Sequence, residues 1–158
     1  MIVVIGFVLL GTGCVNTTKI PTTSVRLDTV VSPSSSTQLD LSNRGLERVS
    51  SAVFKMSQLE ELNLSNNRLT GALPGEIRFL QNLRILNASG NQMTGVPAEI
   101  GQLSKLEELN LSNNQLTGLP NELGNLSSLR VLNLRGNNIS QQDLDGIRSK
   151  LKETEIIE

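Results

Sequence analysis

The chain contains no histidine, no tryptophan and no tyrosine, and only one cysteine and three phenylalanines among its 158 residues. Without histidine, the sequence lacks the commonest general base, the imidazole of serine and cysteine triads, and the commonest zinc ligand. A single cysteine excludes an intrachain disulfide and a thiolate cluster. These absences predict a protein that is not an enzyme, and we expect neither a bound metal nor a cofactor.

The charge is balanced rather than basic. The chain carries 14 Lys and Arg against 15 Asp and Glu, for a formal net charge of −1 at pH 7. It has no run of basic residues, which is the usual signature of a nucleic-acid surface. Aromatic residues, on which bases stack, make up only 2% of the chain. Nucleic acid is therefore not an expected partner.

Residues 1–13 carry no charged side chain and include an apolar run over 2–10. As a helix, thirteen residues reach about 20 Å, which is short of the roughly 30 Å hydrocarbon layer of a membrane. The length suits the apolar region of an export signal instead. We therefore expect 1–13 to be a signal peptide and the protein to be exported.

The sequence Leu10-Gly11-Thr12-Gly13-Cys14 follows this apolar run. It resembles the lipobox of bacterial lipoproteins, and the resemblance implies cleavage before Cys14 and lipidation of its thiol. An acylated cysteine would hold the protein on the extracytoplasmic side of a membrane, since two or more acyl chains give stable anchoring. The alternative is an ordinary cleaved signal peptide with an incidental cysteine.

Residues 14–35 are rich in Ser, Thr and Pro, as in the stretch Ser32-Pro33-Ser34. Such a composition buries little apolar surface and is typical of a flexible tether. Val25 and Leu27 leave a second interpretation open, in which this segment forms an irregular strand that covers the first repeat. Solenoid folds need capped ends.

The remaining sequence is repetitive. The string LEELNLSNN, followed by LTG and LP, begins at Leu59 and again at Leu106, with a looser copy between them. The period divides the chain into 36–58, 59–82, 83–105, 106–128 and 129–151. These units resemble the leucine-rich repeat family, whose pattern is L-x-x-L-x-L-x-x-N-x-L. The resemblance implies an α/β fold, a right-handed horseshoe solenoid with short parallel strands on its concave face and short helical or 3₁₀ segments on its convex face.

The side chains within a unit have predictable directions. Leu109 and Leu111 are two residues apart, so in a strand they point to the same side, which we take as the interior. Equivalent leucines recur in each unit, although Ala88 interrupts one of the two columns. An asparagine follows each of the last four strands, where its amide can pair with backbone groups that have left the strand. In the family this is the structural asparagine ladder, here Asn67, Asn91, Asn114 and Asn137.

The last unit ends with a different pattern. Ser140 and Asp143 resemble a helix capping box, and Leu144, Ile147 and Leu151 then share one helical face. We expect 129–151 to form a capping repeat that closes the C-terminal end of the stack with a short amphipathic helix. Residues 152–158 are expected to be a frayed tail.

The outward residues of the strands are the candidate binding site. Adjacent units also place Glu60, Arg84, Glu107 and Arg130 in alternation, which predicts cross-strand ion pairs. Arginine is common at interface hot spots, and the apolar pair Ile85 and Val131 is the alternative anchor on this face. The candidate concave-face residues are Glu61, Asn63, Ser65, Arg84, Ile85, Asn87, Glu108, Asn110, Ser112, Arg130, Val131, Asn133 and Arg135.

Taken together, these features predict a non-enzymatic, membrane-tethered repeat protein that binds a partner through its concave face. The partner is expected to be another protein or a surface polymer. A structural protein of the cell envelope and a regulatory subunit of a separate enzyme are the alternatives. Fold alone does not choose among them.

Overall fold

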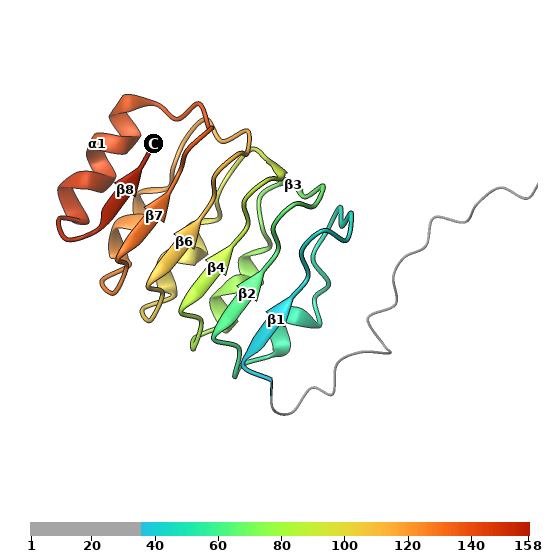
Figure 1. Ribbon diagram of the computed structural model, residues 1–158. Coiled ribbons are helices and arrows are strands. Elements are labelled where there is room, and N and C mark those ends of the chain that lie inside the picture. Colours follow the sequence, from blue (N-terminus) through green and yellow to red (C-terminus); the bar gives the residue numbers. More distant parts are fainter. Residues whose placement is uncertain (1–35) are drawn as a thin grey trace, which may run out of the picture.

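The computed structural model describes residues 36–158, which form a stack of rungs with a six-stranded parallel sheet along one face (Figure 1). The strand order follows the chain, so each strand pairs with that of the next rung. The strands are β1 (Gln38–Asp40), β2 (Glu61–Asn63), β4 (Ile85–Asn87), β6 (Glu108–Asn110), β7 (Val131–Asn133) and β8 (Glu155–Ile157).

The pairing register aligns the middle residue of every strand. Leu62 lies opposite Leu86, Leu86 opposite Leu109, and Leu109 opposite Leu132. All four side chains are at most 1% exposed. The second leucine column is buried as well, and Ala88 at its interruption is 0% exposed. The predicted α/β solenoid and its inward columns are therefore confirmed.

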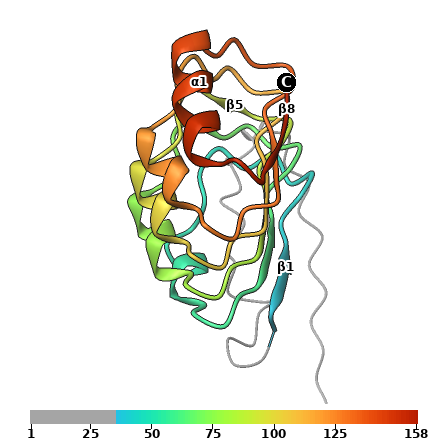
Figure 2. The ribbon, with the colours of Figure 1, turned by 90° about the vertical axis from the view of Figure 1, so that its left-hand side faces the viewer.

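The face opposite the sheet carries short 3₁₀ helices (Figure 2). Each of the last three begins after a proline whose extended backbone turns the chain, and each buries one aliphatic side chain. In the third rung, a Cβ at Gly101 would collide with the Glu122 carbonyl of the next rung, so only glycine permits this close stacking. The helices are η2 (Val53–Lys55), η3 (Gly75–Phe79), η4 (Ala98–Gln102) and η5 (Asn121–Asn125).

A second, two-stranded parallel sheet was not anticipated from the sequence. It joins β3 (Thr70–Gly71) to β5 (Gln92–Met93) where the chain turns from the main sheet toward the 3₁₀ helices. The strands are only two residues long, so alternation of apolar and polar residues, which requires at least four, could not reveal them. This sheet links the second and third rungs on a side that the main sheet does not reach.

The C-terminal end is closed as predicted by an amphipathic helix, α1 (Gln141–Lys150). The Ser140 hydroxyl accepts the Asp143 N–H at 3.2 Å, which caps the helix, and Leu144 and Ile147 are buried. The frayed tail expected over 152–158 is wrong in part. Strand β8 pairs in parallel with β7, because Ile156 fills the inward column opposite Leu132 and is partly buried against the core.

The predicted signal peptide, the tether and the lipidated cysteine lie in residues 1–35, outside the described part of the chain. The alternative strand over the first repeat also falls there. Across residues 36–158, no helix is both long enough and apolar enough to cross a membrane.

Candidate binding surface

The outward side chains of the main sheet form three columns that run across the strands. The first residues of the strands make one column, and they follow one another in register as Gln38, Glu61, Ile85, Glu108, Val131 and Glu155. The third residues make a second column of four asparagines, flanked by Asp40 and Ile157. The residues that precede the strands make the third, with Arg84 and Arg130.

The asparagines of the second column each accept a hydrogen bond from their own backbone. The Oδ1 atom of Asn63 accepts the Ser65 backbone N–H at 3.1 Å, and Asn87, Asn110 and Asn133 make the equivalent bond at the same distance. This bond closes the turn that ends each strand. The side-chain oxygens of these four candidates are therefore engaged by their own backbone.

Neither of the two candidate serines is on the surface. Ser65 and Ser112 are each only 7% exposed, which corrects the expectation that they face a partner. The turn closed by the preceding asparagine folds the chain inward at this position, and the Ser112 hydroxyl donates to Asn110 Oδ1 at 2.8 Å. Arg135, at the equivalent place in the last rung, is exposed.

The predicted charge alternation produces one close ion pair. Arg84 Nε lies 2.8 Å from Glu107 Oε1, and their side chains are 52% and 29% exposed. This hydrogen bond lowers the pKa of the Glu107 carboxyl and raises the pKa of the Arg84 guanidinium. Arg130 lowers the pKa of Glu107 further through its charge. The Arg84 side chain is therefore ion-paired with Glu107 of the next rung.

The four asparagines of the ladder lie behind the sheet, where the chain leaves each strand. Asn114 is typical: its Oδ1 accepts the Met93 N–H at 3.0 Å, and its Nδ2 donates to the carbonyls of Ala88 and Leu111, both at 3.0 Å. Asn67, Asn91 and Asn137 make the corresponding bonds in their rungs. Each amide thus joins two rungs and is unsuited to contact a partner.

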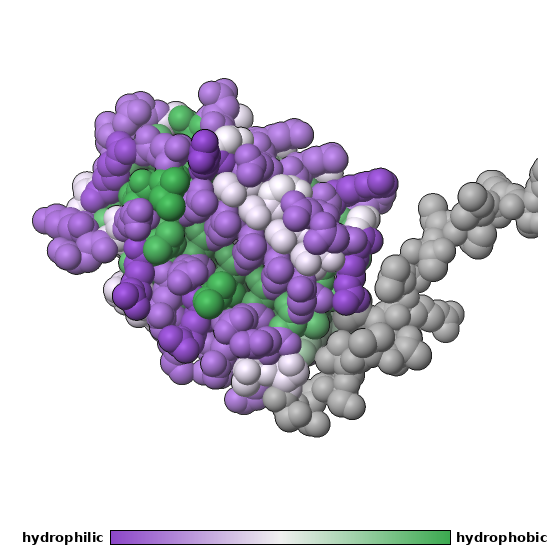
Figure 3. Space-filling model, in the orientation of Figure 1, coloured by the Kyte–Doolittle hydropathy of each residue, from purple (hydrophilic) through white to green (hydrophobic). Residues whose placement is uncertain are grey.

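The outer surface is hollowed toward its N-terminal end. A depression of about 310 Å³ lies over β1, β2 and β4 and is lined by the side chains of Asp40, Glu61 and Ile85, among others. Figure 3 shows this face in space-filling form, with patches of apolar surface between hydrophilic side chains over the strands. Its lining combines the acidic Asp40 and Glu61 with the apolar Leu39 and Ile85.

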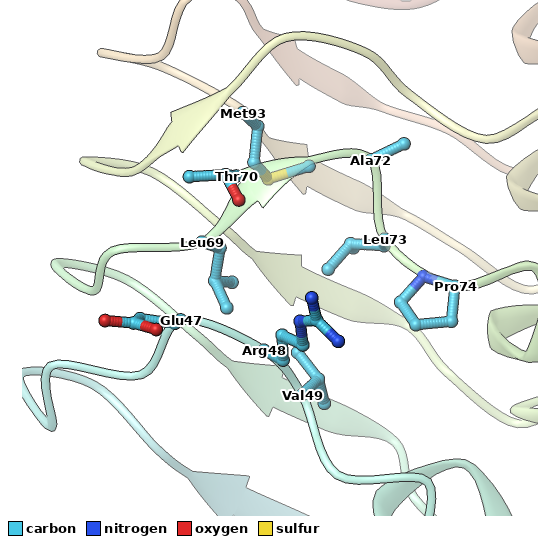
Figure 4. A pocket seen from close by; sticks show the side chains of 9 residues that line it. All are labelled: Glu47, Arg48, Val49, Leu69, Thr70, Ala72, Leu73, Pro74 and Met93. Atoms are coloured by element: carbon cyan, nitrogen blue, oxygen red, sulfur yellow. The ribbon is translucent and has the colours of Figure 1, made fainter. Parts of the chain in front are cut away.

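A second cavity, of about 260 Å³, lies beside the small sheet (Figure 4). Leu69, Leu73 and Met93 line it, and the Arg48 guanidinium points toward Leu73 while the Glu47 carboxylate points away. A specific ligand site needs several polar groups that converge on the cavity. Because the Glu47 carboxylate points away and only Arg48 turns a charged group toward it, this cavity is the weaker candidate.

The structure adds two residues that sequence reasoning missed. Glu155 and Ile157 extend the outward columns by one strand, because β8 pairs with β7. The signal was present, since Ile156 follows Leu132 by 24 residues, which is one repeat period. It was hidden because the α-helix replaces the usual convex segment of the last repeat.

Known proteins share this architecture. A family model described as "Leucine-rich repeat region" matches residues 38–153. The chain therefore belongs to the leucine-rich repeat family.

Among solved structures, a leucine-rich repeat protein of Leptospira interrogans is 44% identical, with a TM-score of 0.65, over 68% of this chain and 27% of the other. The leucine-rich repeat ectodomain of the receptor kinase SOBIR1 from Arabidopsis thaliana is 31% identical, with a TM-score of 0.62, over 75% of this chain and 66% of the other.

A curated relative is an enzyme subunit, but the similarity to it is local. The exoribonuclease subunit Ccr4 of the CCR4-Not complex from Neurospora crassa is 51% identical over 51 residues, which are 32% of this chain and 6% of that protein. So short a match does not extend the exoribonuclease activity to this chain.

Proposed function

We propose that this protein is a non-enzymatic interaction module that binds another protein through the outer face of its main sheet. The observation that carries the proposal is the position of Ile85 and Val131, which are half-buried aliphatic side chains on the solvent side of the sheet. Arg84 and Arg130 precede them in the chain. Protein interfaces bury apolar area and are enriched in arginine, and the two lie side by side here.

The same observation favours a protein over a surface polymer. A strongly hydrophilic polymer would leave Ile85 and Val131 without an apolar contact, whereas a protein can cover them with its own apolar side chains. The engagement of the asparagine oxygens in turns also reduces the number of acceptors for a polymer rich in hydroxyl groups.

We further propose that the module is exported and held on a membrane by a lipid on Cys14, with 15–35 as its tether. The apolar leader and the lipobox-like sequence support this. The similarity to a receptor-kinase ectodomain supports export. Labelling cells with radioactive palmitate tests the anchor: we expect incorporation that disappears in the Cys14→Ser variant, and label that persists in this variant contradicts it.

Capture of partners from a membrane extract tests the binding face. We expect the wild-type protein to enrich one partner, and the triple variant Ile85→Ala, Arg130→Ala, Val131→Ala to lose it. Phe79→Ala is the matched control, because Phe79 is exposed by 52% on the opposite, convex side. A circular dichroism melt verifies that both variants fold. Retention of the partner by the triple variant would place the binding site elsewhere.

A further inference from the structure

From β2 to β8, the outward column at the first strand position alternates between acidic and aliphatic residues, and Gln38 of β1 precedes it. Its register is Glu61, Ile85, Glu108, Val131 and Glu155, with each residue directly opposite the next. Adjacent strands lie about 4.8 Å apart, so successive carboxylates are separated by about 9.6 Å. An aliphatic side chain occupies each gap.

Stacking does not require this alternation. Like charges directly opposite one another destabilise a sheet, so a column of glutamates in every rung would be unfavourable. A neutral polar residue in the gaps would remove the repulsion equally well, as the neighbouring column does with an asparagine in four consecutive strands. The aliphatic residues instead leave apolar area half-exposed between the charges.

The carboxylates of this column are largely uncompensated. Glu61 accepts a hydrogen bond from Gln38 Nε2 at 2.9 Å. The charge of Arg84 acts on Glu61, but Arg84 makes its ion pair with Glu107 rather than with a member of the column. Within residues 36–158, neither Glu108 nor Glu155 takes part in an ion pair. The column therefore presents negative charge at every second strand.

We propose that the partner segment seated on this column is a basic peptide in the polyproline II conformation, with Lys or Arg at every third position. The proposal rests on the proposed function and names the chemistry of its partner. A polyproline II helix has three residues per turn and rises about 3.1 Å per residue, so its same-face residues recur every ~9.3 Å. This repeat matches the ~9.6 Å between carboxylates.

Other peptide conformations fit the column less well. An extended strand presents same-face residues every ~6.7 Å, and an α-helix repeats every ~5.4 Å per turn. Neither spacing places successive cations over successive carboxylates. In the polyproline II register, the backbone and the apolar stems of the cationic side chains pass over Ile85 and Val131 between successive carboxylates. The span from Glu61 to Glu155 is four strand steps, about 19 Å, which accommodates roughly seven residues.

Synthetic peptides of equal composition test the register. Each contains three lysines among prolines and alanines, with the lysines separated by one, two or three residues, and carries a fluorophore for anisotropy measurements. The protein is the full-length chain in mild detergent. Exposed ion pairs are individually weak, so we expect three in register to make the two-residue spacing bind about tenfold more tightly than the others. Raising the salt concentration to about 0.5 M should remove most of this preference.

The Glu108→Gln variant removes the central carboxylate and should abolish the preference for the two-residue spacing. Glu122→Gln, which makes the same change on the convex helix η5, should leave the preference intact. Equal affinities for the three peptides, or an undiminished preference in Glu108→Gln, would overturn the inference. A dimer seen in sedimentation without peptide, and lost in Glu108→Gln, would also overturn it, because a second copy would then occupy the column.

The two proposals fail differently. If the triple variant loses its captured partner while the peptides show no preferred spacing, only the polyproline II inference is wrong. If the triple variant keeps its partner and the peptides show no preferred spacing, the outer face is not the binding surface, and both proposals are wrong.

Discussion

The inside and the outside of the main sheet repeat with different periods. The inward column holds a leucine in four consecutive strands, Leu62, Leu86, Leu109 and Leu132. The outward column beside it alternates between glutamate and an aliphatic residue over the same strands. Close packing of identical rungs requires the first period, because each rung buries its neighbour's apolar wall. It does not require the second, so core packing does not explain the outward period.

The same two-rung period extends beyond a single column. The second and fourth repeats begin with Leu-Glu-Glu-Leu, at 59–62 and 106–109, whereas the third and fifth begin with Leu-Arg, an aliphatic residue and Leu, at 83–86 and 129–132. The ion pair between Arg84 and Glu107 joins one kind of rung to the other. The core of the solenoid thus repeats with every rung, whereas its surface repeats with every second rung.

The largest expected effect comes from truncating the inward column. Leu109→Ala should lower the free energy of unfolding by about 2–5 kcal/mol, because a fully enclosed side chain is lost and a cavity remains. Its neighbour on the outer face provides the contrast, since Glu108→Gln should change stability by less than about 0.5 kcal/mol. Urea denaturation of both variants measures the difference, and equal losses would mean that the two faces are not distinct.

The second-largest loss of stability is expected when an asparagine of the ladder is replaced. Asn114→Ala leaves the buried Met93 N–H and two carbonyls without their side-chain partner, and one such unpaired buried group costs about 1–3 kcal/mol. Asn110→Ala, on the outer face of the same rung, removes a bond at a half-exposed turn and should cost less. Thermal melts compare the stability of the two variants. A larger loss in Asn110→Ala than in Asn114→Ala would contradict the conclusion that Asn114 is the asparagine that joins two rungs.

Removal of the last strand should have a smaller and more local effect. Truncation after Glu153 deletes the Leu134 N–H bond to the Ile157 carbonyl and the Glu155 N–H bond to the Arg130 carbonyl. At about 0.5–1.5 kcal/mol per bond, we expect the two bonds together to account for a loss of about 1–3 kcal/mol. Hydrogen exchange at the Leu134 amide should accelerate, whereas the Leu64 amide, bonded to Asn87 near the other end, should be unaffected. Uniform acceleration would indicate that the rungs do not open separately.

The smallest expected effect concerns the surface ion pair. Because Arg84 lowers the pKa of Glu107 in the folded state, the pair stabilises the fold above the ordinary carboxyl pKa of 4.5, and this contribution is lost as the pH falls through the lowered value. Melting curves between pH 7 and about pH 3 should therefore show a slightly steeper loss of stability in the wild type than in Arg84→Gln. Parallel curves would show that the pair contributes nothing.

Much of the core could be predicted because the repeat makes each rung a copy of the next. The leucine columns and the capped C-terminal helix follow from spacing and from local capping chemistry. The 3₁₀ segments of the convex face were implied by the family resemblance. The burial of Ser65 and Ser112 could not be predicted in this way. The in–out alternation of the strand was extended to these two residues, although the chain has already turned there.

The surface was harder to predict for a related reason. The outward column could be read from the strands, but its continuation to Glu155 depends on a pairing across the whole of α1. The use of the asparagine oxygens in turns depends on a backbone bend that apolar periodicity does not encode. Residues that serve the turn and residues that are open to a partner look alike in the sequence.

The two-rung surface period limits how this molecule can change its length. Inserting a single 23-residue unit would preserve every inward contact, yet it would bring two glutamate rungs, or two arginine rungs, side by side. Inserting a pair would lengthen the outward column and keep its phase. A protein engineer could therefore extend this surface in steps of two repeats, and a natural relative of different length that keeps the pattern should differ by an even number.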